Sequence, residues 1–419
     1  MKKDNVIKHT FDNGLKLLIV PGYRSKHIWL RILVGAGSCR EEKGHRGLSH
    51  LTEHLIINSL FDIKNQAGFK KVFFQSLEKH SAFNDFDYTT FEVILHRRNA
   101  YLNIKNLLFN FFNIRRFSPR SCSESKKSLD REFYREMHYK KTGRLYTTLY
   151  ENAYKKHPYK WYTFGHKEDY SKLTSQDIFK FYRSLYIPNN TVAVVIGPVS
   201  APKLIRHVEE IINRIKARKI PQQNISPESF QTKPRYLILK YGLSYEILLL
   251  GFKIPPLGHP LRLGLNALNN LILDNKLLVY DRSPILTIFG YLPLTKHNGL
   301  YEIFIMLNQG HHSREGENKF FSVVKKYLSG KMRPDIINSA KVATIQEHNL
   351  IKKNPGAFSK YLGVYELFLG NYSLFVNYIN LIKNLSKEDL LLDLANTIRK
   401  RNLTAVTLKR DKRRVPHDY

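Results

Sequence analysis

The stretch Gly47-Leu-Ser-His-Leu-Thr-Glu-His54 holds the most informative pattern in this chain of 419 residues. Leucines recur through it at helical spacing, so a helix is predicted to begin near Gly47. His50 and His54 are four residues apart, which places both imidazoles on one face of that helix, about one turn apart. Two imidazoles in this arrangement are suited to bind one small metal ion, and zinc is an ion that imidazole nitrogens bind well.

Glu53 is three residues after His50 and lies beside the same helical face. Its carboxylate could therefore take a proton from a water activated by the metal, which is the general-base role in metal-assisted hydrolysis. The order His-x-x-Glu-His is the inverted form of a zinc-peptidase signature. The alternative is a polar helix face with solvated histidines.

A catalytic zinc takes three protein ligands and keeps one position open. Glu132 and Glu136 are four residues apart on a helix predicted from Glu124 to Tyr139, and either carboxylate could complete the site. From the residues alone the choice stays open, and each glutamate could instead be an exposed helix residue.

The chain divides into two halves with similar element order but no residue-level repeat. Each half is predicted to be an α+β domain with a mainly antiparallel sheet covered by helices on one face. Proline, glutamine, asparagine and serine gather between residues 220 and 234, a composition typical of a linker. The predicted parts are an N-terminal domain at 1–219 that carries the metal motif, the linker at 220–234, and a C-terminal domain at 235–419 without one.

The composition excludes several classes of protein. Apolar residues make up 42% and there are 25 Tyr and 25 Phe, which excludes collagen-like, low-complexity and wholly disordered chains. Cys39 and Cys122 are the only cysteines, which excludes a disulfide scaffold and fits a reducing compartment. No apolar run approaches the ~18 residues of a membrane span, and the N-terminus does not resemble a signal peptide. We expect a cytoplasmic protein without a transmembrane segment.

The net charge is 68 − 35 = +33, with a basic cluster from Arg399 to Arg414. Such a charge attracts polyanions, including nucleic acid, acidic membrane surfaces and acidic peptides. No recognised nucleic-acid module accompanies it, so no specific nucleic-acid partner is expected. A Lys-rich surface could equally serve solubility, and a basic polyanion-binding protein remains an alternative function.

Further stretches, together with the metal helix, resemble the insulinase–pitrilysin family of zinc metallopeptidases, which includes the mitochondrial processing peptidase and half-size bacterial peptidases. Similar segments occur along nearly all of the N-terminal half, at 11–16, 35–41, 47–54, 81–84, 87–91, 157–159, 174–181 and 186–197.

The resemblance implies one zinc per chain, held by His50, His54 and a glutamate on a later helix, with Glu53 as the base. Glu132 follows His54 by 132 − 54 = 78 residues, which fits the family spacing better than Glu136 does. Glu132 is therefore the preferred third ligand and Glu136 the alternative. A supporting glutamate of the family would fall near Ser125, whereas this sequence has Glu124 one position away.

The resemblance also implies substrate contacts, with departures from the family pattern. Ser81 and Ala82 occupy the strand motif in which the family usually has Asn before Ala. Arg282 and Tyr291 match a substrate-binding Arg…Tyr pair, but nine residues separate them, which is too long. The alternative for this pair is a surface arginine and a strand tyrosine.

Family members bind an extended peptide as an added strand inside a chamber made of two halves. A chain of this length implies one half, with a second half-size subunit supplying the other. The incomplete Arg…Tyr pair favours a heterodimer over a homodimer, and the positive charge favours acidic peptides or leader segments as substrates. The competing interpretation is an inactive family member that acts as a structural or substrate-binding subunit.

Overall fold

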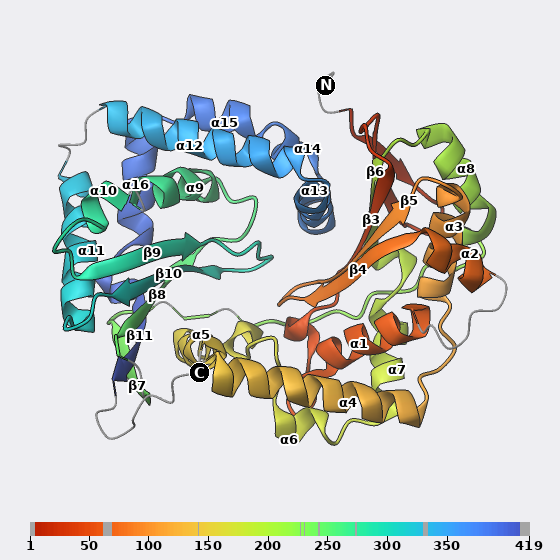
Figure 1. The fold of residues 1–419 in the computed structure, drawn as a ribbon, viewed down its shortest axis with the longest axis horizontal. Coiled ribbons are helices and arrows are strands. Elements are labelled where there is room, and N and C mark those ends of the chain that lie inside the picture. The colour runs from red at the N-terminus through yellow and green to blue at the C-terminus, as the bar shows by residue number, and fades with distance from the viewer. Residues whose placement is uncertain are drawn as a thin grey trace. The chain divides into compact units, whose positions relative to one another are not determined.

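The computed structural model describes residues 5–61, 69–140, 142–226, 228–229, 231–241, 244–272, 275–329 and 334–410. They form two compact units, each built on one sheet (Figure 1). Unit 1 comprises the described residues of 1–134, 163–225 and 351–376, and unit 2 those of 135–162, 226–350 and 377–419.

Unit 1 contains a six-stranded sheet in the order β1-β2-β6-β3-β5-β4. Its neighbours are antiparallel except for the β2–β6 pair. The Asp12-Asn-Gly14 turn between β1 and β2 requires Gly14 at φ +82°, a conformation that glycine adopts readily. The strands are β1 (Ile7–Thr10), β2 (Lys16–Pro21), β3 (His27–Val34), β4 (Leu77–Asn84), β5 (Thr89–His96) and β6 (Thr191–Gly197).

Helices cover both faces of this sheet. On β3, alternate apolar residues such as Leu30 and Ile32 belong to the main core of unit 1, which includes leucines of α1. Arg31 and Leu33, which alternate with them along the strand, contact α13 instead. The helices of unit 1 are α1 (Leu48–Phe61), α2 (Phe69–Ser76), α3 (Ala100–Phe112), α4 (Pro119–Tyr134), α6 (Lys167–Tyr170), α7 (Ser175–Leu185), α8 (Ala201–Ile212), α13 (Pro355–Leu369) and α14 (Ser373–Val376).

The α13 helix comes from the second half of the chain and packs closely on β3. Gly363 is essential to this approach, because a Cβ there would lie 2.2 Å from Leu33 Cδ1. The buried Arg31 side chain donates to Ser359 Oγ at 2.9 Å and to the Gly356 carbonyl at 3.0 Å. A sheet covered on one face only was expected, and unit 1 differs because this distant segment covers its second face.

Unit 2 contains a five-stranded sheet in the order β7-β11-β8-β10-β9, antiparallel except for the β7–β11 pair. Its strands are β7 (Arg235–Tyr241), β8 (Ile247–Ile254), β9 (Ile285–Tyr291), β10 (Gly299–Leu307) and β11 (Leu403–Arg410). Its helices are α5 (Thr142–Ala153), α9 (Leu261–Ile272), α10 (Asn275–Leu278), α11 (Ser313–Leu328), most of α12 (Pro334–Lys353), α15 (Tyr378–Asn384) and α16 (Lys387–Thr397).

The α5 helix comes from the first half of the chain and packs on β8 and β11 of unit 2. A Cβ at Gly251 on β8 would lie 2.8 Å from Leu149 Cδ1 of α5. The buried Tyr150 hydroxyl of α5 donates to Glu302 on β10. The strands of the unit 1 sheet therefore lie within 1–219 and those of the unit 2 sheet within 235–419. The compact units do not follow these ranges, because unit 2 includes 135–162 and unit 1 includes 351–376. One helix from each half of the chain covers the sheet formed by the other half.

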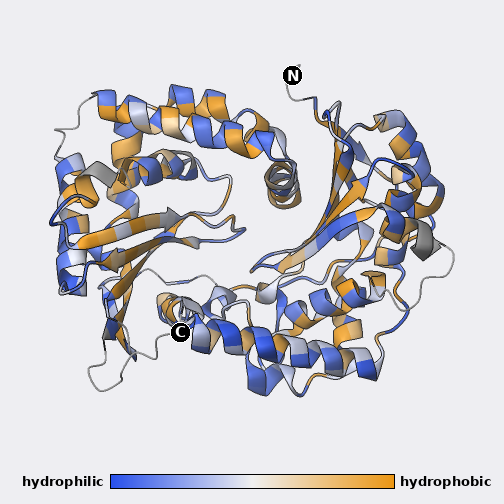
Figure 2. Ribbon diagram, viewed as in Figure 1, coloured by the Kyte–Doolittle hydropathy of each residue, from blue (hydrophilic) through white to orange (hydrophobic). Residues whose placement is uncertain are grey.

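The predicted α+β class with two similar, mainly antiparallel sheets is confirmed. Figure 2 shows long hydrophobic stretches on strands of both sheets, whereas α4 is coloured mostly hydrophilic. Among the described helices, none combines the length and the apolar character needed to span a membrane.

Candidate metal centre

The N-terminus of α1 is fixed by Glu41, which lies in the turn after β3. Its carboxylate accepts hydrogen bonds of 2.8 Å from the backbone N–H groups of Gly47 and Ser49, and one of 2.7 Å from the Ser49 hydroxyl. These N–H groups have no partner within the helix, so Glu41 acts as its cap. Burial raises the pKa of Glu41 to about 7, although these hydrogen bonds oppose the shift.

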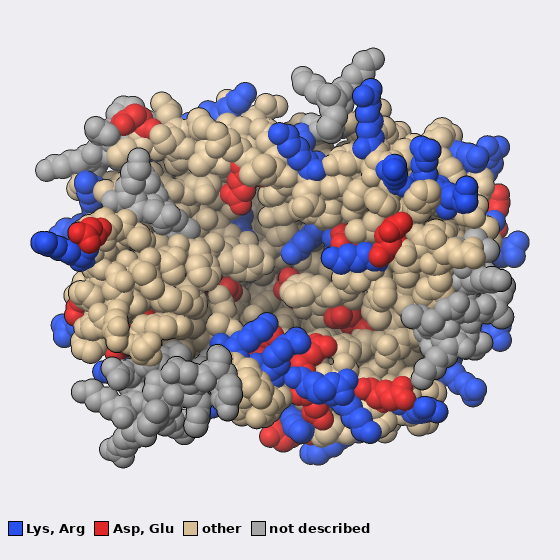
Figure 3. All heavy atoms as spheres, in the orientation of Figure 1, with Lys and Arg blue, Asp and Glu red and all other residues tan. Residues whose placement is uncertain are grey.

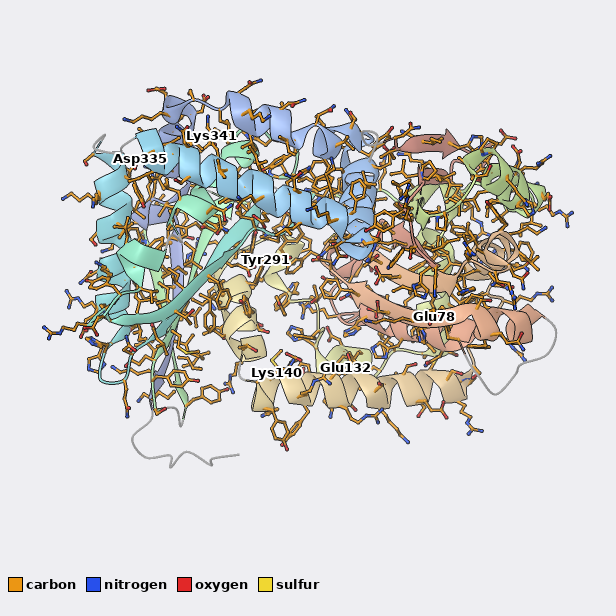
Figure 4. The ribbon with its side chains drawn as sticks, turned by 45° about the horizontal axis from the view of Figure 1, so that its top comes forward. Glu78, Glu132, Lys140, Tyr291, Asp335 and Lys341 are labelled. Atoms are coloured by element: carbon orange, nitrogen blue, oxygen red, sulfur yellow. The ribbon has the colours of Figure 1, made fainter. Side chains whose placement is uncertain are left out.

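Three potential ligands meet between α1 and α4. The Nε2 atom of His50 lies 3.5 Å from one Glu132 carboxylate oxygen, and the Nε2 atom of His54 lies 3.6 Å from the other. One ligand atom from each residue lies within 4.8 Å of the other two. Glu132 is labelled on α4 in Figure 4. Two imidazole nitrogens and one carboxylate oxygen form a donor set that fits zinc and leaves a fourth position open.

The charges of the three side chains reinforce one another. Hydrogen bonds to His50 and His54 hold the pKa of the Glu132 carboxyl well below its usual range. For His54, burial lowers the pKa, but the hydrogen bond to Glu132 and the charges of Glu53 and Glu132 outweigh it and raise the pKa. Glu132 is therefore ionised at neutral pH and is available as a ligand.

Glu53 lies beside this group with 8% of its surface exposed. Burial raises the pKa of its carboxyl, the imidazoles of His50 and His54 oppose the shift, and the charge of Glu132 adds to it. Its Oε2 atom is buried and has no hydrogen-bond partner among the described residues. An unsatisfied buried carboxylate oxygen is costly, and a water held at the open metal position would satisfy it.

Glu136 is not a member of this group. The α-helix ends at Tyr134, and Glu136 belongs to a π-helical turn, Arg135–Tyr139. Its carboxylate forms ion pairs with Lys140 Nζ at 2.7 Å and with Arg135 Nε at 3.5 Å. We predicted that Glu132 and Glu136 share a helical face because they are four residues apart. That spacing holds only in a continuous α-helix, and the change to a π-helical turn before Glu136 removes it.

A contact that the sequence analysis missed joins α1 to α4. Asn58 Nδ2 donates to the hydroxyl of Ser125 at 3.1 Å, and Ser125 is buried. Ser125 is the position at which the family resemblance led us to look for a supporting glutamate. The neighbouring Glu124 is exposed and pairs with Arg120 at 3.1 Å. The hydrogen bond between the two helices that carry the candidate ligands is therefore made by a neutral pair.

Ser81 and Ala82 lie on β4, the last strand in the order of the unit 1 sheet. They pair with Glu92 and Phe91 of β5 on one side. Within the described part of the chain, no strand pairs with the other side of β4. Phe83 on the same strand is 52% exposed. Such an edge can pair with an added extended peptide.

Arg282 and Tyr291 are not brought together. Arg282 lies in the turn before β9 with φ +64°, and Tyr291 is the last residue of β9, where Figure 4 labels it. Both are exposed, Tyr291 by 49%. A strand of seven residues spans roughly 20 Å, which separates the two side chains.

Two family models match this chain. "Insulinase (Peptidase family M16)" matches residues 24–166 and "Peptidase M16 inactive domain" matches residues 172–343. The "Zinc protease PqqE" of Helicobacter pylori is 27% identical over 278 residues, which are 64% of this chain and 61% of that protein. The "Probable zinc protease PqqL" of Escherichia coli is 20% identical over 56% of this chain and 26% of its own length. The chain thus aligns with less than two thirds of each of these relatives.

Solved structures share the fold. A protease from Helicobacter pylori superposes with a TM-score of 0.87 at 20% identity, covering 96% of this chain and 99% of its own. A Pseudomonas fluorescens structure described as a peptidase M16 inactive domain gives 0.83 at 14% identity, covering 97% and 98%. The periplasmic protease PqqL from Escherichia coli gives 0.76 at 15% identity, covering 98% of this chain and 48% of that one.

Proposed function

Because the chain belongs to the insulinase family of M16 peptidases, we propose that it is a zinc-dependent endopeptidase that hydrolyses extended peptides. The observation that supports this most strongly is the group of His50, His54 and Glu132 with Glu53 beside it. His50, His54 and Glu132 would hold a zinc ion, which when bound would supply a Lewis acid that lowers the pKa of a water and polarises the scissile carbonyl.

Glu53 acts as the general base and then as the general acid. Its unsatisfied Oε2 takes a proton from the attacking water. The burial that raises its pKa also favours its protonated form, which delivers the proton to the leaving amine nitrogen. His50, His54 and Glu132 lie together beside this carboxylate, so a water bound between them and Glu53 would be positioned before the reaction begins.

The substrate is an extended peptide that pairs with β4. Backbone groups at Ser81 and Ala82 on the edge strand supply the hydrogen bonds, and the exposed Phe83 ring supplies an apolar contact. Ser81 replaces the asparagine that family members usually carry before the alanine, which removes one side-chain amide from substrate binding. The net charge of +33 favours acidic peptides or leader segments, and Lys and Arg side chains are spread over the face shown in Figure 3.

A second half-size subunit completes the enzyme in this proposal. The Escherichia coli PqqL chain is about twice as long as the part that superposes on this chain. The separated Arg282 and Tyr291 favour a heterodimer whose partner supplies the intact pair, with a homodimer as the alternative. Light scattering of the purified chain, alone and mixed with a candidate second subunit, distinguishes a monomer, a homodimer and a heterodimer.

Cytoplasmic localisation remains a prediction, tested by fractionating cells and detecting the chain with an antibody.

Two other functions also remain open. An inactive structural or substrate-binding subunit would bind peptide without cleaving it. A polyanion-binding protein would bind nucleic acid or acidic membranes with an affinity that falls steeply as salt is added.

The proposed function is tested by zinc content and peptide hydrolysis of the purified chain with its second subunit. About one zinc per chain and chelator-sensitive hydrolysis are expected. His50→Ala and His54→Ala should lose both, because two ligands bind zinc poorly. His207→Ala, which changes a histidine on α8 outside the metal group, is the control and should retain both. Unchanged zinc content in the His50 and His54 variants would contradict the proposal.

A further inference from the structure

A cavity of about 300 Å³ lies in unit 1, where the segments that follow α3, α7 and α8 come together. None of its lining residues is His50, Glu53, His54 or Glu132, so it is separate from the metal group. Cavities of this size hold small organic molecules.

Four cationic side chains line the cavity, and its lining includes no acidic residue. They are Arg115, Arg183, Lys216 and Arg218, and all four are exposed. No described carboxylate forms an ion pair with any of them; Arg218 donates instead to the backbone carbonyl of Arg183 at 3.1 Å. Three helices end near the cavity, each with about half a negative charge at its C-terminus, which offsets only part of four full positive charges.

The cavity also has an aromatic wall, formed by the partly exposed Phe179 ring, with the buried Tyr182, 2% exposed, behind it in the lining. Their rings stack with centroids 6.0 Å apart and planes inclined by 23°. The Tyr182 hydroxyl donates to the Phe111 carbonyl at 2.8 Å and accepts from the Ile114 N–H at 3.2 Å, so this ring is held in place without a ligand. The wall is therefore preformed, which lowers the entropic cost of binding.

We propose that this cavity binds a nucleoside monophosphate, or a small ligand with the same chemistry of a planar ring joined to a phosphate. Arginine binds phosphate through several directed N–H groups, and a second cation such as Lys216 adds charge. Bases stack on aromatic rings and on guanidinium planes, and the Arg183 guanidinium already lies 5.8 Å from the centroid of the Phe179 ring. The two halves of such a ligand match the two kinds of side chain in the lining.

The test must separate this cavity from the general attraction of a chain with charge +33. Titration calorimetry of the full chain with adenosine 5′-monophosphate compares two double variants with equal charge change. Arg115→Glu/Lys216→Glu alters the lining, whereas Arg116→Glu/Arg214→Glu alters exposed neighbours that do not line the cavity. We expect the first to weaken binding by about tenfold or more and the second by less than about twofold, because nearby exposed charges are screened by salt.

Equal weakening in both double variants, or no binding to the unaltered chain, would overturn the proposal. If Arg115→Glu/Lys216→Glu does not fold, as judged by circular dichroism, the single variants Lys216→Gln and Arg214→Gln replace the pair with the same expected contrast.

Two further ligands test whether both halves of the nucleotide are needed. Adenosine lacks the anion and inorganic phosphate lacks the ring, so each should bind at least about tenfold more weakly than the monophosphate. Phe179→Leu removes an aromatic face but keeps an apolar side chain, and it should weaken the monophosphate without changing inorganic phosphate. Inorganic phosphate binding as tightly as the nucleotide would overturn the assignment of a ring-bearing ligand.

Discussion

The sheets of the two units follow the same path through their strands. In unit 1 the order β2-β6-β3-β5-β4 contains one parallel pair, β2–β6, followed by antiparallel neighbours. In unit 2 the order β7-β11-β8-β10-β9 repeats this arrangement, with β7–β11 as the parallel pair. Among the strands that the structure describes, only β1 has no counterpart. Each sheet is also covered on one face by a helix from the other half of the chain.

The two units differ at the helix that follows the central strand. In unit 1, α1 follows β3 and carries the two histidines and Glu53. In unit 2, α9 follows β8, and its polar side chains are Arg262 and three asparagines, which form hydrogen bonds within the unit. Asn266 donates to Tyr378 at 2.6 Å, and Asn269 accepts from Tyr301 at 2.8 Å. A shared fold thus supplies a helix at the same point in the chain order, and the side chains decide whether it can bind a metal.

The largest expected effect comes from the third ligand, which distinguishes unit 1 from unit 2 most directly. Glu132→Gln replaces an ionised carboxylate by a neutral amide, so zinc should be lost on dialysis and peptide hydrolysis should fall below detection. Glu136→Gln breaks only ion pairs with Lys140 and Arg135 and should retain zinc. Metal analysis of both variants side by side measures the contrast. The reverse pattern would transfer the ligand role to Glu136.

The next effect separates metal binding from catalysis within α1. Glu53→Gln keeps all three ligands but removes the base, so zinc content should stay the same while kcat falls by about 10²–10⁴-fold. Hydrolysis of a fluorogenic peptide and metal analysis of the same preparation provide the two readouts. Unaltered turnover would remove Glu53 from the mechanism, and turnover already absent from the unaltered enzyme would support the inactive-subunit alternative.

The free energy of unfolding should reveal whether α13 and α5, the helices that cover the two sheets, pack equally closely. Gly363→Leu in unit 1 and Gly251→Leu in unit 2 overfill tight contacts and should each destabilise the chain by about 1–3 kcal/mol. Adding Leu33→Ala to the first, or Leu149→Ala to the second, makes room, so the paired changes should cost less than the sum of the single ones. Urea unfolding of the four single and two double variants measures this. Additive costs would mean that the helix does not contact that leucine.

Much of the fold and of the metal group could be predicted from local patterns. An Asp-Asn-Gly sequence such as 12–14 is a strong hairpin signal and lies between β1 and β2, and the i, i+4 spacing of the histidines predicted that His50 and His54 share the helix face beside Glu53. Glu132 required the family spacing, because the helix period alone treats Glu136 as equivalent and gives no warning of the π-helical turn.

Contacts between distant segments could not be predicted in this way. Nothing local in 142–153 or 355–369 shows which sheet these helices cover, since apolar faces pack on either sheet equally well. The cap formed by Glu41 also depends on a turn that returns the carboxylate to a helix beginning several residues later. The available signal was that Glu41 lies in the segment 35–41, which resembles the family. That segment does not show that the Glu41 carboxylate binds Gly47 and Ser49.

The smallest expected effect concerns how the two corresponding helices begin. The carboxylate of Glu41 caps α1, whereas at α9 the Leu261 N–H donates to the His259 imidazole at 3.2 Å. The pKa of Glu41 is raised from its ordinary value of 4.5 to about 7. Between these values the folded chain holds a proton that the unfolded chain has released. The contribution of Glu41 to the free energy of unfolding therefore falls as pH rises across this window, by at most about 1.4 kcal/mol per pH unit.

Glu41→Gln has no proton to release, so it should flatten this part of the stability profile. It should also lower stability at acidic pH, where an amide oxygen replaces only part of the carboxyl's contacts with Gly47 and Ser49. The measurement is the urea midpoint of the metal-free chain from about pH 4.5 to about pH 7.5. Glu42→Gln removes an exposed neighbouring carboxylate and is the matched control, with the profile expected to keep its slope. Equal flattening in both variants would mean that the slope does not come from the cap of α1, and the proposed difference between the two helix starts would fail.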